Sequence, residues 1–149
     1  MPTAKPFRIY LSHTIRGTQG DKATPGLMRR NMQAAIKTGE HLDAYFLDWE
    51  KMYGLCKINL YVPGVHDDFP QAAMAREWLS IAQVLDLDCD IIDTCDMMLV
   101  RGNYISGGMR YEIEHAAEVG IPTFQFDKVS KKVMANIYDT IHLILKGDL

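Results

Sequence analysis

The chain has 149 residues, of which 48% are hydrophobic and 23% are charged, and its formal net charge is −3. This size and composition are typical of one globular domain and exclude a disordered or fibrous protein. A negative net charge without a basic run argues against a nucleic-acid partner, because duplex binding relies on Lys and Arg at the phosphates. We therefore expect a single domain over residues 1–149.

The cysteines and the hydropathy pattern indicate where the protein resides. Cys56, Cys89 and Cys95 lack the spacing of a zinc site or a disulfide framework. No apolar run is long enough to span a bilayer, and the opening segment MPTAKPF lacks the apolar core of a signal peptide. We expect reduced thiols in a cytoplasmic protein that has no membrane partner.

The first predicted element is a strand over FRIYLS, residues 7–12, because the segment alternates and is rich in β-branched and aromatic residues. A polar loop with three glycines, HTIRGTQGDKATPG, follows this strand. Within it, Thr24 predicts the N-cap of a helix that has Pro25 at its first position. Apolar residues three and four positions apart extend this helix past a kink near Gly39 to Trp49.

The rest of the chain continues the alternation of strands and helices. The segment KINLYVPG, residues 57–64, predicts a second strand, and the acidic turn HDDFP leads into a helix over residues 71–87. The aspartate-rich residues 86–96 predict a short helix that leads into MMLVRG, residues 97–102, an apolar strand of the kind buried on both faces. The last predicted elements are a helix containing Glu112, a strand over 121–126 and a helix over 131–147.

This order of elements predicts the fold and the place of a ligand site. Strands that alternate with helices indicate an α/β fold, which we expect to be a compact, doubly wound, Rossmann- or flavodoxin-like domain with a mainly parallel sheet and helices on both faces. Ligands bind such sheets at the carboxyl ends of the strands. The glycine-rich loops after Ser12 and Val100 both begin at such ends, so we expect them to be neighbours.

The segment SGGMRYE, residues 106–112, contains the first candidate for chemistry. Gly107 and Gly108 predict a turn with torsions that other residues avoid and room for a ligand close to the main chain. The start of the following helix favours an anion. Glu112, expected in the first helical turn, is either a solvated acid that complements the helix dipole or an ionised carboxylate poised as a nucleophile.

Three other polar features are candidates for the same site. Arg16 beside Gly17 is either a phosphate ligand or a solvated loop arginine. His13 is the one histidine next to this loop. A dense run of aspartates could raise the pKa of one member and make it a general acid, could cap and solvate a helix, or could bind a hard cation: Asp86, Asp88, Asp90, Asp93 and Asp96. The run lacks the glycine and terminal glutamate of an EF-hand loop, and we assign no metal site.

Four motifs, taken in order, resemble the nucleoside 2-deoxyribosyltransferase family: IYLSHTIRG, an aspartate before the third strand, SGGMRYE and GIPTF. The likeness is greatest to its 2′-deoxynucleoside 5′-phosphate N-hydrolase branch. The resemblance implies a compact doubly wound fold and an enzyme that needs no cofactor and cleaves or exchanges the N-glycosidic bond of a (deoxy)nucleoside 5′-monophosphate. It gives Glu112 the role of a nucleophile that forms a glycosyl-enzyme intermediate, and Asp88 the role of the acid that protonates the leaving base.

The resemblance also implies a set of substrate-binding residues. Ser106 would contact the 5′-phosphate, and the remaining positions would line the nucleotide pocket: Ser12, His13, Ile15, Arg16, Gly17 and Gly108. Asn136 would reach the site of a neighbouring subunit, which implies a homodimer or a dimer of dimers. The alternatives left open are a nucleotide-binding or sensor module without catalysis and an interaction protein on the same fold.

Overall fold

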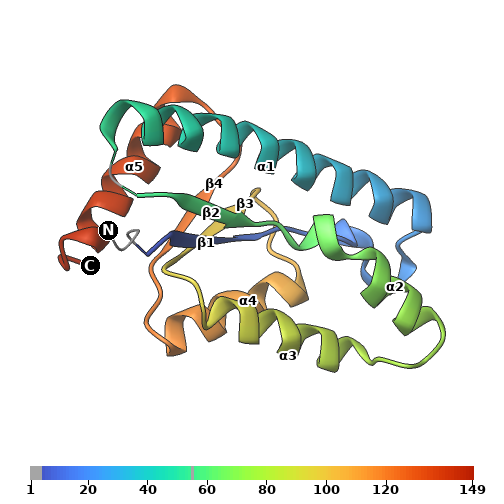
Figure 1. The fold of residues 1–149 in the computed structure, drawn as a ribbon. Coiled ribbons are helices and arrows are strands. Elements are labelled where there is room, and N and C mark those ends of the chain that lie inside the picture. Colours follow the sequence, from blue (N-terminus) through green and yellow to red (C-terminus); the bar gives the residue numbers. More distant parts are fainter. Residues whose placement is uncertain (1–4, 55) are drawn as a thin grey trace.

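The computed structural model describes residues 5–54 and 56–149, so residues 1–4 of the opening segment judged for a signal peptide lie outside it. Figure 1 shows its elements in chain order: β1 (Phe7–Ser12), η1 (Gly17–Lys22), α1 (Pro25–Tyr53), β2 (Ile58–Tyr61), η2 (Pro63–His66), α2 (Asp68–Ala75), α3 (Ile81–Ile92), β3 (Met97–Arg101), α4 (Gly107–Glu118), β4 (Thr123–Phe126) and α5 (Lys131–Leu145). Within this part of the chain, no helix has the combination of length and apolar character that crossing a bilayer requires.

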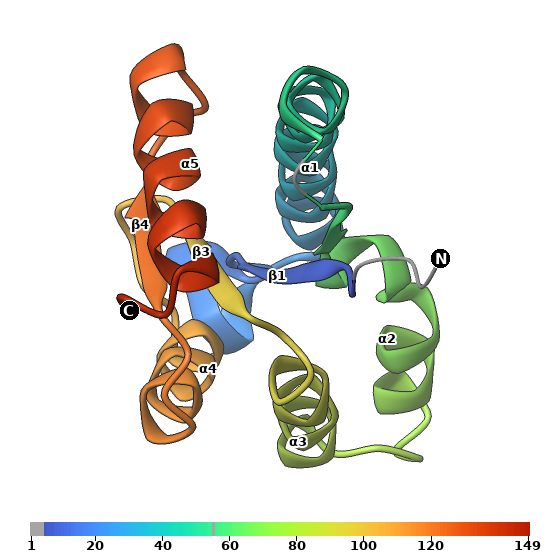
Figure 2. The ribbon, with the colours of Figure 1, turned by 60° about the vertical axis from the view of Figure 1, so that its left-hand side comes forward.

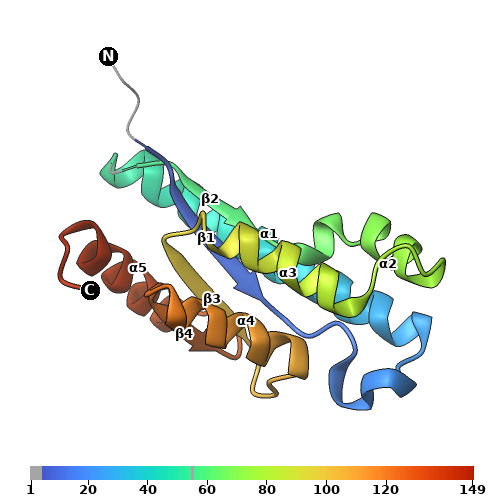
Figure 3. The same ribbon diagram turned by 90° about the horizontal axis from the view of Figure 1, so that it is seen from below.

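The four strands form one parallel sheet in the order β2-β1-β3-β4. Helices α1 and α5 lie on one face, and α3 and α4 lie on the other (Figure 2). Seen from below, α3 and α4 run side by side, while α2 lies beyond the carboxyl end of β2 (Figure 3). The predicted α/β class with a parallel sheet is confirmed, and the arrangement is Rossmann-like.

Strands β1 and β3 are the two central strands, and their side chains alternate between two cores. Fully buried side chains of both strands pack with α1 and α5 on one face: Ile9, Leu11, Met97 and Leu99. The intervening residues pack with α3 and α4 on the other face: Tyr10, Met98 and Val100. The prediction that residues 97–100 are buried on both faces is confirmed, since all four are at most 1% exposed.

The predicted proximity of the two loops is also confirmed. Ser12, the last residue of β1, pairs in register with Val100 of β3. Because the strands are parallel, both loops leave the sheet at the same edge and from adjacent positions. The helix that follows β1 lies on one face of the sheet and the helix that follows β3 lies on the other (Figure 2).

The prediction of one helix over residues 71–87 is wrong, because the chain breaks between α2 and α3. After Ala75 the backbone turns at Glu77, which has a φ of 59°. The N–H of Trp78 donates to the carbonyl oxygen of Ala73 at 2.8 Å, the pattern of a left-handed helix cap. Helix α3 then begins after Ser80, which forms a reciprocal capping box with Gln83. Residues 86–92 of the aspartate-rich segment are consequently the second half of α3 and not a separate short helix, and residues 93–96 connect α3 to β3.

The predicted kink near Gly39 is likewise wrong, since α1 continues through this residue to Tyr53. Gly39 is buried against Val62, and a Cβ atom at this position would come within 2.8 Å of the Val62 Cγ2 atom. The glycine therefore permits close packing of α1 on the segment that leads from β2 into η2. The start of α1 is as predicted, because the Thr24 side chain accepts a hydrogen bond from the N–H of Leu27.

This contact gives a testable prediction for Gly39→Ala. Forcing a methyl group against Val62 costs about 1–3 kcal/mol, which exceeds the gain of about 1 kcal/mol from the helix preference of alanine. We expect chemical denaturation to show a lower free energy of unfolding. Gly26→Ala in the same helix is the control, because its added Cβ meets no atom closer than 3.9 Å, and it should leave stability unchanged or slightly higher. Equal effects of the two substitutions would contradict the packing role of Gly39.

Candidate functional site

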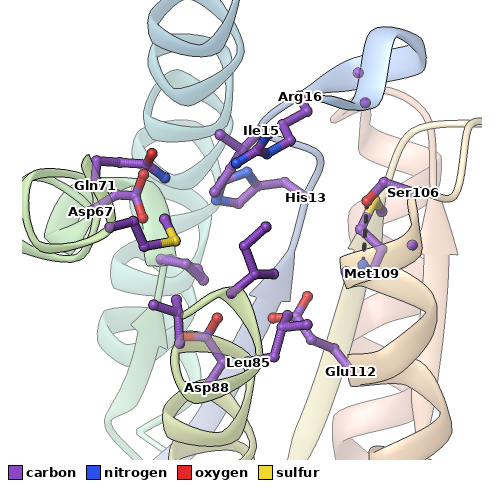
Figure 4. A pocket seen from close by; sticks show the side chains of 18 of the residues that line it. His13, Ile15, Arg16, Asp67, Gln71, Leu85, Asp88, Ser106, Met109 and Glu112 are labelled. Carbon is purple, nitrogen blue, oxygen red and sulfur yellow. Dashed lines mark hydrogen bonds between the residues drawn. The ribbon is translucent and has the colours of Figure 1, made fainter. Parts of the chain in front are cut away.

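A cavity of about 410 Å³ lies at the carboxyl ends of β1, β2 and β3. Its walls come from the loop after β1, from η2 with α2, from α3, and from the turn that opens α4 (Figure 4). It lies where the connections after β1 and β3 leave for opposite faces, the usual ligand position in open α/β sheets. Its size is in the range of small-molecule sites, about 300–1,000 Å³.

Glu112 lies on the α4 side of this cavity and is 5% exposed. Two hydroxyl groups of β1 donate to its carboxyl group: the Tyr10 hydroxyl to Oε2, and the Ser12 hydroxyl to Oε1 at 2.8 Å. Tyr10 and Ser12 are two positions apart and share one face of the strand. Both carboxyl oxygens of Glu112 are therefore oriented by a rigid central strand.

The predicted first-turn position of Glu112 is wrong. Helix α4 begins at Gly107 and has no acidic residue in its first turn, so Glu112 lies in the second turn. Burial raises its pKa from 4.5 to about 7, the hydrogen bonds from Tyr10 and Ser12 lower it, and the nearby Asp88 raises it. Desolvation exceeds the stabilisation from the two donors. Glu112 is thus neither a solvated acid nor a carboxylate held ionised by the helix start.

Asp88 is the one member of the aspartate run that lines the cavity. Burial raises its pKa from 3.8 to about 6, and the charge of Asp67 raises it further. The expectation that the run would raise the pKa of its own members is therefore not met at Asp88. The neighbouring charge comes from Asp67, just before α2.

The other aspartates of the run have different roles. Asp86 accepts a hydrogen bond from the Tyr111 hydroxyl at 2.9 Å, and Asp93 pairs with His115 at 2.6 Å, so both tie α3 to α4. Asp96 accepts from the N–H of Arg8 at 2.9 Å, and Asp90 is exposed. Within the described ranges, no group of three or more His, Cys, Asp or Glu side chains is arranged to hold a metal ion.

His13 forms part of the cavity wall and is 6% exposed. Its Nε2 atom accepts a hydrogen bond from the N–H of Gly64 at 3.1 Å, and its Nδ1 atom lies 3.3 Å from the carbonyl oxygen of Thr14. Burial lowers its pKa to about 4. These contacts fit a neutral imidazole with the proton on Nδ1 that joins the loop after β1 to η2.

Ile15, Arg16 and Gly17 continue this wall, whereas Ser12 does not line the cavity and acts on it through Glu112. Gly17 has a left-handed φ of 62°. The loop is held in place by Asn31 of α1, whose side-chain amide donates to the carbonyl oxygen of Ile15 at 2.8 Å. The turn thus brings Arg16 to the upper end of the cavity in Figure 4.

Ser106 caps α4, since its hydroxyl oxygen accepts a hydrogen bond from the N–H of Met109 at 3.3 Å. The expectation of unusual glycine torsions is wrong here, because Gly107 and Gly108 are not among the glycines with positive φ. Both line the cavity, and a Cβ at Gly107 would meet no atom of the described chain within 4 Å. Gly107 therefore keeps space open next to the start of the helix, whereas a Cβ at Gly108 would contact the Leu85 side chain at 3.5 Å.

Asn136 is the one predicted site residue that neither lines the cavity nor contacts a residue that does. It lies exposed on α5, which covers the opposite face of the sheet from α4. Its carbonyl oxygen accepts a hydrogen bond from the Thr140 hydroxyl within the helix.

Sequence reasoning missed three residues of the site. Tyr10 lies in the predicted first strand, and its hydroxyl group donates a hydrogen bond to Glu112. Asp67 and Gln71 line the cavity and follow η2. A signal for Asp67 and Gln71 was available, because the acidic turn HDDFP follows a predicted parallel strand at its carboxyl end.

Comparisons with protein-family models, with curated proteins and with solved structures found nothing that matches this chain.

Proposed function

We propose that the protein is an N-glycosidase or glycosyl transferase that acts on a (deoxy)nucleoside 5′-monophosphate. The observation that carries this proposal is the pair of carboxyl groups on one cavity, Glu112 and Asp88, both with a raised pKa. Enzymes that cleave a glycosidic bond with retention of configuration at the anomeric carbon commonly use two such carboxyl groups. The resemblance to the nucleoside 2-deoxyribosyltransferase family supplies the substrate class.

In the proposed reaction the Glu112 carboxylate attacks C1′ of the sugar and the bond from C1′ to the base nitrogen breaks. The Asp88 carboxyl group gives its proton to the leaving base, which departs neutral. Water, or a second base, then attacks C1′ of the glycosyl-enzyme, loses a proton to Asp88 and frees Glu112. Tyr10 and Ser12 support the first step because they hold both oxygens of the nucleophile.

The 5′-phosphate would bind near Arg16, Ser106 and Gly107, which all line the cavity. Free N–H groups at the start of α4 and a guanidinium group suit an anion there. A doubly wound sheet binds nucleotides at this position, between the two central strands. Asn136, exposed on α5, would complete the site of a second copy in a homodimer or dimer of dimers, as the resemblance implies.

The two carboxyl groups predict the pH dependence of kcat/KM. Below about pH 6 both are protonated and no nucleophile is present, whereas above about pH 7 both are ionised and no acid is present. We expect a narrow bell with its maximum between these values, measured from initial rates of base release. Asp88→Asn should abolish this bell-shaped pH dependence. A kcat/KM that does not change over the whole pH range would contradict the roles given to Glu112 and Asp88. The singly protonated pair carries its proton mainly on Glu112, so substrate binding must move that proton to Asp88.

The proposal is tested by incubating the protein with ribo- and deoxyribonucleoside 5′-monophosphates and with the matching nucleosides. Chromatography follows the free base, and a second base is added in parallel to detect transfer. We expect release from at least one monophosphate, and faster release from it than from its nucleoside. No release or exchange from any compound would contradict the enzymatic proposal.

A non-catalytic nucleotide-binding module is the alternative outcome of this test. A monophosphate that raises the melting temperature without any base release would favour it, because a ligand that binds only the folded state stabilises that state. The absence of both base release and a melting-temperature shift would exclude both the enzyme and the binding module.

A further inference from the structure

The cavity contains a third carboxyl group, that of Asp67, which the proposed reaction does not use. Asp67 is 6% exposed, and its Oδ2 atom finds no hydrogen-bond partner among the described residues. An unpaired buried acceptor costs about 1–3 kcal/mol, so an interaction that satisfies it is expected when the cavity is occupied. The carboxyl group turns easily about its Cβ–Cγ bond, and either oxygen can face the cavity.

Helix capping does not account for this residue. Asp67 directly precedes α2, but its side chain makes no capping hydrogen bond to the helix. Burial raises its pKa, the interaction with the Gln71 side chain lowers it, and the charge of Asp68 raises it. An ionised carboxyl group offers acceptors alone, and a protonated one keeps its carbonyl oxygen as an acceptor. In either state the group presents an acceptor that needs a donor.

Gln71 places a second polar group next to this acceptor. The N–H of Gln71 donates to the carbonyl oxygen of Asp67 at 3.0 Å, which puts the two side chains one helical turn apart. Both side chains lie on the side of the cavity opposite α4, with the carboxyl group of Asp67 beside the carboxamide of Gln71 (Figure 4).

The cavity next to this polar pair has apolar walls. They come from α2 and α3: Met74, Ile81, Val84 and Leu85. A flat ring with apolar faces and one polar edge matches this combination, and a nucleobase is such a ring. With C1′ of a nucleotide at Glu112 and its phosphate at Ser106, the side toward Asp67 is the one left for the base.

We propose that Asp67, with Gln71 beside it, selects a nucleobase that carries an exocyclic amino group, whose N–H donates to the unpaired Asp67 oxygen. This inference rests on the proposed function, since it assumes a nucleotide in the cavity. A keto oxygen at the same position would face the acceptor oxygen of an ionised Asp67 and leave both oxygens unpaired. A carboxylate that accepts from a base amino group is a common form of base recognition.

The test is calorimetric binding of five 2′-deoxynucleoside 5′-monophosphates to a Glu112→Gln protein, which keeps the cavity and lacks the nucleophile. The bases are adenine, guanine, hypoxanthine, cytosine and uracil. Adenine or guanine against hypoxanthine, and cytosine against uracil, are pairs that differ at an amino group. We expect at least one amino-bearing member to bind about tenfold or more tighter than its partner.

Adding Asp67→Asn, which replaces one acceptor oxygen by a donor, should lower that preference about tenfold or reverse it. Adding Asp68→Asn is the control, because it removes an exposed carboxyl group one position away and should leave the preference unchanged. Pairs that all bind within about threefold, or a preference that survives Asp67→Asn, would overturn this inference while nucleotide binding still supports the proposed function. If none of the five nucleotides binds, this inference falls, and the base-release test decides the proposed function. The comparison of pairs needs no change at Asp67, so it decides the question even if that variant does not fold.

Discussion

Replacing Glu112 by glutamine should reduce the rate of base release by about a thousandfold or more, because the variant has no carboxylate to attack C1′. Glutamine has nearly the same shape, and its carboxamide can accept from one of the Tyr10 and Ser12 hydroxyl groups and donate to the other. The loss therefore reports the chemistry of the carboxyl group and not a collapse of the cavity. The loss is measured from initial rates of base release with the best monophosphate. The variant is used at a concentration high enough for its own rate to exceed that of any contaminating enzyme.

Glu114→Gln is the matched control for this prediction. Glu114 lies two positions further along α4, is exposed and does not line the cavity. It should release base at the wild-type rate. A Glu112→Gln protein that is as fast as this control would remove Glu112 from the mechanism and return it to a structural role.

The same substitution should make the folded protein more stable at alkaline pH. In the unfolded chain Glu112 ionises near pH 4.5, whereas in the folded protein it keeps its proton up to about pH 7. Between these values the folded state binds more protons, so its free energy of unfolding falls as the pH rises. The shift corresponds to a loss of about 3 kcal/mol that is complete above the folded pKa. Glutamine is neutral in both states and avoids this loss.

We therefore expect the Glu112→Gln protein to unfold at a higher urea concentration than the wild type at roughly pH 8, with a free energy of unfolding that is larger by about 3 kcal/mol. At roughly pH 4 the two free energies of unfolding should differ little. The sign follows from the raised pKa: the wild type is penalised where the carboxyl group must ionise inside the protein. Glu114→Gln should show no comparable difference. A variant that is less stable than the wild type at both pH values would show that burial of the charge is not what raises the pKa.

Together the two results would show a residue that lowers stability in the state in which it acts. Ionised Glu112 is desolvated between α4 and β1, and two hydroxyl donors offset only part of that cost. Loss of function with a gain in stability is the expected pattern at sites where selection acts on chemistry. A carboxyl group kept only for packing would not show it.

Much of the fold could be predicted from the sequence because its signals are local. Alternating burial in β1 and the continuous apolar run of β3 are visible in consecutive residues, and Thr24 with Pro25 marks the start of α1. Parallel order then forces the loops after these strands to share one edge. The left-handed turn at Glu77 leaves little local signal in the sequence, whereas Ser80 followed by Gln83 has the spacing of a capping box and marks the start of α3.

The sequence by itself determined the parallel α/β architecture and the edge of the sheet where Glu112 and Asp88 meet a glycine-rich loop. The tertiary structure alone decided how these acids behave. The hydrogen bond from Tyr10 to Glu112 joins residues 102 positions apart, and Asp67 acts on Asp88 from a different element. A pKa depends on how much water surrounds a group and on which charges and donors face it, and these are fixed only when distant segments pack together.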